Sequence, residues 1–62
     1  MTYEEMIEEL IANGDIEEDE KINLVDYYDL PVPTEWIIHE VVGIAHNSDT
    51  DIVTIVVIAT ED

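Results

Sequence analysis

Residues 52–59 read IVTIVVIA, a stretch in which seven of eight side chains are β-branched and only Thr54 is polar. β-Branched residues favour extended strands over helices. In a strand, alternate side chains face opposite sides, and here both sides are apolar: Val53, Ile55, Val57 and Ala59 on one, Ile52, Val56 and Ile58 on the other. A strand that is apolar on both faces needs cover on both. We expect the protein's own helix to cover one face, and a second copy, a partner or only a loose minimal core to cover the other.

The sequence before this strand predicts its antiparallel partner. The polar cluster Asn47–Asp51 has the composition of a turn, and residues 36–44 are again rich in isoleucine and valine. We therefore predict a long β-hairpin over residues 35–60.

Residues 2–13 carry the signals of an amphipathic helix. Thr2 and Glu5 have the spacing of a capping box, and Asn13-Gly14 is a typical helix end. Apolar residues recur at helical spacing between them, at Tyr3, Met6, Ile7, Leu10 and Ile11.

Residues 15–30 allow two interpretations. Asp15 and Glu18 could cap a second helix that runs to Tyr28, whereas the alternation of Ile22 and Leu24 with Tyr28 and Leu30 would suit a strand. We favour the helix because its entry is rich in glutamate and its length is suitable. The expected fold is α+β: one or two N-terminal acidic helices packed on a two- or three-stranded antiparallel sheet with a long C-terminal β-hairpin.

The length and the charge limit the class of protein. Sixty-two residues form one domain, residues 1–62, and the absence of cysteine excludes disulfides and thiolate metal sites. Seventeen acidic residues stand against one lysine, which gives a net charge of −16. Direct binding to nucleic acid or to an anionic membrane needs lysine and arginine, so we exclude both. No apolar run has the length of a membrane span and no secretion signal is visible, so we expect a cytoplasmic protein.

The charge predicts a basic partner. Eleven of the seventeen carboxylates fall within residues 1–29, with almost no cation between them. A solvated surface is the ordinary explanation of a charge run, but solubility does not require this much charge. We expect the protein to bind a basic nucleic-acid-binding protein by presenting carboxylates where DNA presents phosphates. The candidate contacts are Glu4, Glu5, Glu8, Glu9, Glu17, Glu18, Asp19, Glu20, Asp26 and Asp29.

Catalysis and metal binding have weaker support in the sequence. Asn47–Asp51 has alternating oxygen ligands but lacks the glycine of a calcium loop, and Ile58 stands where its bidentate glutamate would be. His39 and His46 are an odd number of residues apart, so in a regular strand they face opposite sides. No arrangement of side chains offers an activated nucleophile. We predict no enzyme activity, no cofactor and no metal.

The acidic character resembles that of the small phage-encoded proteins that disable host defences: DNA mimics, anti-restriction proteins and anti-CRISPR proteins. Glu20-Lys21-Ile22 is similar to the Glu-x-Ile segment of the uracil-DNA glycosylase inhibitor family, and Asn47–Asp51 to its acidic hairpin turn. The resemblance implies a cytoplasmic inhibitor that acts in a bacterial host. Two alternatives stay open: an antitoxin or regulator that neutralises a small basic protein, and an adaptor that acts through the apolar hairpin. We also expect the protein to form a homodimer through the Val/Ile-rich hairpin.

Overall fold

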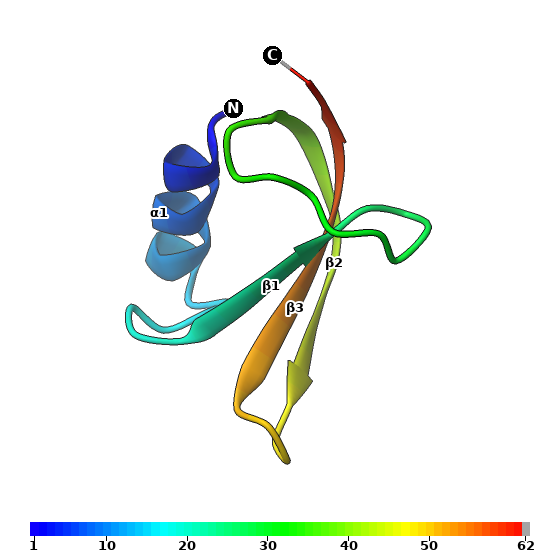
Figure 1. The fold of residues 1–62 in the computed structure, drawn as a ribbon. Coiled ribbons are helices and arrows are strands. Elements are labelled where there is room, and N and C mark those ends of the chain that lie inside the picture. The colour runs from blue at the N-terminus through cyan, green and yellow to red at the C-terminus, as the bar shows by residue number, and fades with distance from the viewer. Residues whose placement is uncertain (62) are drawn as a thin grey trace.

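One helix packs on one face of a three-stranded sheet in the computed structural model, which describes residues 1–61 (Figure 1). The elements follow in the order α1 (Tyr3–Asn13), β1 (Lys21–Val25), β2 (Ile37–Asn47) and β3 (Ile52–Thr60). The α+β class, the first helix and the C-terminal hairpin are therefore confirmed. Within the described residues, no helix is long and apolar enough to cross a membrane.

The ends of α1 are those that the sequence predicts. The Thr2 hydroxyl accepts a hydrogen bond from the Glu5 amide at 3.2 Å, and the Glu5 carboxylate accepts one from the Thr2 amide at 2.9 Å. At the other end Gly14 has a φ of 81°, and the amides of Gly14 and Asp15 donate to the carbonyls of Ile11 and Leu10. These two bonds form a Schellman motif, which turns the chain back toward the sheet.

The sheet has the strand order β1-β3-β2, with β3 in the centre. β2 pairs with β3 as the antiparallel hairpin, whereas β1 pairs with β3 in parallel, with Leu24 opposite Ile55. The sheet is therefore mixed. The prediction of an all-antiparallel sheet is wrong for the β1–β3 pair. The parallel direction follows from the 26–36 connection, which leaves β1 beside Val56 and starts β2 beside Thr60, at the same end of the sheet. β2 therefore runs antiparallel to β1, and β3, which is antiparallel to β2, runs parallel to β1.

The preferred second helix over residues 15–28 is wrong, and the alternative strand is present in a shorter form as β1. β3 has two edges, and the hairpin satisfies the backbone groups of only one. β1 supplies partners for the other, and backbone pairing of this kind outweighs a weak local helix propensity. Ile22 and Leu24 then face the core, while Tyr28, which a helix would have buried, is 82% exposed.

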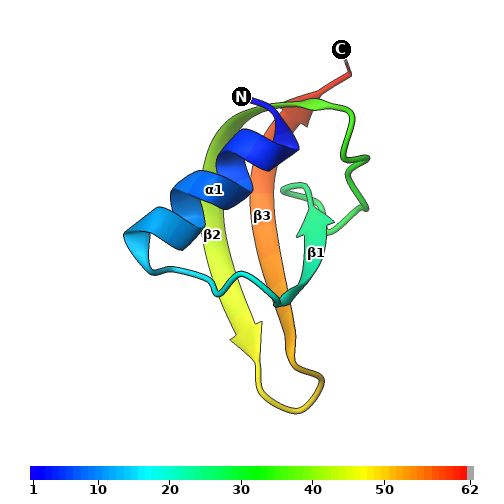
Figure 2. The same cartoon turned by 90° about the vertical axis from the view of Figure 1, so that its left-hand side faces the viewer.

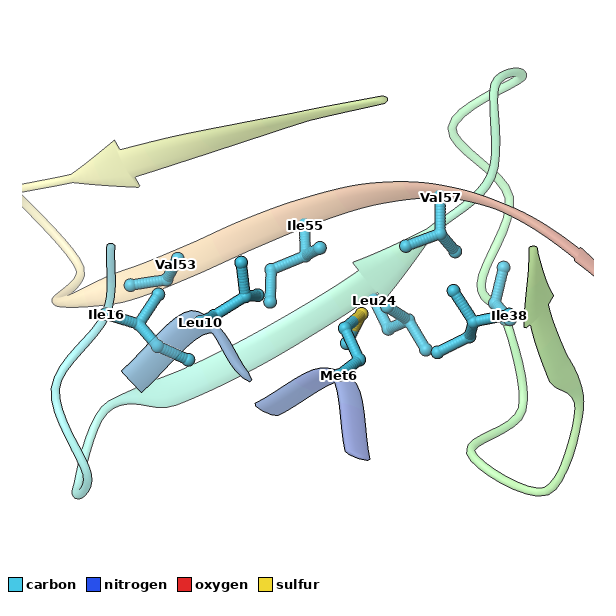
Figure 3. Packing of buried hydrophobic residues seen from close by; sticks show 9 residues of the cluster. Met6, Leu10, Ile16, Leu24, Ile38, Val53, Ile55 and Val57 are labelled. Atoms are coloured by element: carbon cyan, nitrogen blue, oxygen red, sulfur yellow. The ribbon is translucent and has the colours of Figure 1, made fainter. Parts of the chain in front are cut away.

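The core lies between α1 and one face of the sheet (Figures 2 and 3). Met6 and Leu10 from α1 pack against side chains of all three strands and of two loops. The further members of the cluster are Ile16, Leu24, Val32, Ile38, Val53, Ile55 and Val57. The alternation expected for β3 is confirmed, because Val53, Ile55 and Val57 are buried while Ile58 is 43% exposed.

Candidate partner-binding surface

The exposed side of α1 is densely charged. Glu4, Glu5, Glu8 and Glu9 are all exposed there, while Met6 and Leu10 on the other side are buried. Four carboxylates in six residues, at a rise of about 1.5 Å per residue, amount to one charge per ~2.3 Å of helix axis. Duplex DNA carries one per ~1.7 Å. The linear charge density of this helix therefore approaches that of a nucleic acid duplex.

This arrangement lowers the stability of the helix. Glu4 with Glu8, and Glu5 with Glu9, are like charges at i, i+4, a spacing that costs a few tenths of a kcal/mol per pair. Only Glu5 has an evident structural role. The hydrogen bonds that its carboxylate makes with Thr2, first that from the backbone amide and then that from the hydroxyl, lower the pKa of Glu5 below the ordinary value.

The acidic surface continues into the loop that follows α1. Glu17, Glu18 and Asp19 are exposed, and Glu20 is half-buried. The Glu20 carboxylate accepts a hydrogen bond from the Glu17 amide at 3.2 Å, which closes a short turn. Ile16 is buried in the core beside Leu10 and Val53 and anchors this loop to the body of the protein (Figure 3). We call α1 residues 4–9 together with loop residues 15–20 the acidic surface.

The loop meets the turn of the β2–β3 hairpin around a cavity of about 400 Å³. Glu17, Asp19 and Glu20 line one side, and the hairpin contributes His46 and Asp51 among its lining residues. Asp51 was not among the candidate contacts, because no local signal places a hairpin turn beside residues 17–20. Within residues 1–61, no group of three histidine, aspartate or glutamate side chains is arranged to hold a metal ion.

Asp26 and Asp29 do not belong to the acidic surface. They lie in the 26–31 connection, which projects from the side of the sheet opposite to α1 (Figures 1 and 2). The Asp26 carboxylate accepts hydrogen bonds from the amides of Tyr28 at 2.8 Å and Leu30 at 3.0 Å, so it builds the turn. Asp29 is exposed and has a φ of 67°. The structure thus places eight of the ten candidate contacts on α1 and on the loop that follows it, and the other two on a separate connection.

Asp15 is one acidic-surface residue that the candidate list omitted. It is exposed immediately after the helix end, where its amide donates to the Leu10 carbonyl at 2.9 Å. The sequence offered a signal for it, since a carboxylate directly after the helix-ending glycine is adjacent to both charged segments.

Comparisons of this chain with protein-family models, with curated proteins and with solved structures found no match.

Proposed function

We propose that this protein is a stoichiometric inhibitor that occupies the nucleic-acid-binding surface of a basic protein with its acidic surface. The observation that supports the proposal is the charge density of α1, at which carboxylates succeed one another almost as closely along the axis as phosphates do in DNA. A phage protein that disables a bacterial defence system would have this character.

The excess negative charge destabilises the protein itself. Like-charged pairs weaken α1, and a net charge of −16 disfavours the compact state. A partner with a positive surface relieves both effects when it binds. Complementary charges of this kind mainly accelerate association and make it sensitive to salt.

Loss of charge on α1 should weaken partner capture. We would compare the wild-type chain with the triple variant Glu4→Gln, Glu8→Gln, Glu9→Gln, which leaves the capping residue Glu5 in place. The matched control removes three exposed charges outside the acidic surface, by Asp29→Asn, Asp49→Asn and Glu61→Gln. Both variants have a net charge of −13, so an effect of total charge alone would appear in both.

The measurement is a pull-down from bacterial lysate, eluted along a salt gradient, with and without duplex DNA as competitor. We expect a nucleic-acid-binding protein that moderate salt and DNA both release, and an affinity at least about tenfold lower for the α1 variant than for the control. Capture that is indifferent to salt and DNA would contradict the proposal. A basic partner with no affinity for nucleic acid would instead favour an antitoxin or regulator.

A further inference from the structure

The face of the sheet that points away from α1 is covered only at its β1 end, where Val25, the register partner of Val56, is 4% exposed beside the 26–31 connection. Ile52, Val56 and Ile58 of the central strand point to this side, and none of them belongs to the buried cluster. We call this side of the three strands the outer face. β2 has two irregularities in its pairing with β3, between Ile38 and Glu40 and between Val41 and Gly43. Val42 is the extra residue between Val41, which pairs with buried Val57, and Gly43, which pairs with Val56. It therefore lies on the outer face, where it is 45% exposed.

A tight turn borders the outer face. Residues 26–30 project from the end of β1 on this side (Figure 1), and both hydrogen bonds to the Asp26 carboxylate hold the turn in shape. It presents Tyr27, which is 72% exposed, together with Tyr28 and Leu30. Exposed tyrosines on a rigid turn offer a large contact area at a low entropic cost.

Charge is sparse on the strands of the outer face, although the adjoining turn carries Asp26 and the exposed Asp29. Among the described strand residues that face this side, Lys21 and Glu40 are the two that carry a formal charge when histidine is neutral. Their charges cancel, although the whole chain has a net charge of −16. The acidic surface of one copy would repel the acidic surface of another, whereas the strands of two outer faces can meet with one carboxylate from each copy.

Lys21 and Glu40 lie at opposite corners of the outer face. Lys21 is the register partner of Ile52, and Glu40 is the register partner of Ile58. The two corners are therefore about 20 Å apart along the strands and about 10 Å apart across them. The line from Lys21 to Glu40 is a diagonal of the outer face. If two outer faces stack, a twofold axis that lies between the sheets and is perpendicular to this diagonal places Lys21 of each copy against Glu40 of the other. The only lysine of the chain thus has a complement on a second copy of the same surface.

We propose that the outer face binds a second copy of this chain in a symmetric dimer, with the acidic surfaces facing outward on both sides. Three strands of up to about 30 Å cover roughly 400 Å², to which the tyrosine turn adds area. A standard interface buries about 800 Å² per partner. The dimer is therefore weak, with a dissociation constant in the micromolar range, and it does not depend on the function proposed for the acidic surface.

The first test is sedimentation velocity of the full chain over a range of concentrations, with variants that add one negative charge. Val42→Glu places the charge on the outer face, and Ala12→Glu places the same charge on exposed α1. We expect at least about tenfold weaker dimerisation for Val42→Glu and a change within about twofold for Ala12→Glu. Equal effects would overturn the proposal, as would a wild-type chain that stays monomeric at high concentration and high salt.

The second test separates the proposed pair from total charge. Glu40→Lys and Glu8→Lys both change the net charge from −16 to −14, which by itself reduces repulsion between copies. We expect Glu8→Lys to leave the dimer as strong or stronger, Glu40→Lys to weaken it about tenfold, and Lys21→Glu combined with Glu40→Lys to restore it. A stronger dimer with Glu40→Lys would overturn the arrangement. Circular dichroism of every variant verifies folding.

The experiments can refute the dimer without refuting the proposed inhibitor function, and the reverse. Salt screens the repulsion between two acidic copies and strengthens the dimer, whereas it weakens capture of a basic partner. Val42→Glu should lose the dimer and retain DNA-competed capture in the pull-down. If a monomeric wild-type chain captures a partner only when Val42 is intact, the outer face binds that partner and the dimer proposal is overturned.

Discussion

Two isoleucines of β3, three residues apart, allow a direct test of which face is the core. Ile55 has no exposed surface, whereas Ile58 is 43% exposed on the outer face. Substitution by alanine removes three carbon groups at each position, worth about 0.8 kcal/mol each when fully buried. At Ile55 the cavity raises the cost to about 3–5 kcal/mol. At Ile58 the removed groups are only about half-buried and no closed cavity forms. The substitution therefore costs about half of the full burial energy, or about 1–1.5 kcal/mol.

Urea unfolding at low protein concentration, followed by circular dichroism and by the fluorescence of Trp36, measures this difference. With an m-value of about 1 kcal/mol/M, the two midpoints should differ by roughly 2 M. A 62-residue domain has about 3–9 kcal/mol of stability, so Ile55→Ala could unfold it. Valine substitutions are the gentler pair, with about 0.5–1.5 kcal/mol expected at Ile55 and less than half of that at Ile58. Equal costs at the two positions in the monomer would refute the assignment of β3's faces.

Three further perturbations test the support of the acidic surface. Ile16→Ala should lower the free energy of unfolding by about 2–3 kcal/mol. It should also raise amide hydrogen exchange in residues 15–20 more than in β3, because Ile16 anchors that loop. An equal rise in both segments would contradict this role of Ile16. Gly14→Ala should lower the free energy of unfolding by about 1 kcal/mol, because a φ of 81° is strained for alanine even though its Cβ would meet no neighbour. Thermal unfolding measures this loss, and Ala12→Gly serves as a control substitution in the same helix. The pKa of Glu5 is lowered in the folded state, so its contribution is present above the ordinary value of 4.5 and is lost as the pH falls through the folded value. Helical circular dichroism between pH 7 and pH 3 should therefore show a loss that Glu5→Gln reduces and Glu35→Gln does not.

Much of the candidate site could be predicted because it is local. Glu4, Glu5, Glu8 and Glu9 lie on one side of a helix whose apolar positions are spaced along the chain, so the pattern alone decides which side is exposed. The place of Asp51 beside the 17–20 loop could not be predicted in this way, because it depends on the pairing of β1 with β3. The separation of Asp26 and Asp29 from the other carboxylates has the same origin. Both residues follow β1 and leave on the side of the sheet that α1 does not cover.

Local signals in the sequence specify α1 and the β2–β3 hairpin. Their signals are a capping box, a helix-ending glycine, an apolar period and a polar turn between two β-branched runs, and each of these acts between near neighbours in the chain. The conformation of residues 15–30 depends instead on contacts that are distant in the chain. The five residues of β1 are too few for a clear alternation, and their conformation is fixed by the free edge of β3, about thirty residues later in the chain. Tertiary packing likewise decided which apolar side of β3 became the core, because α1 can cover only one face and leaves the other to solvent or to a second molecule.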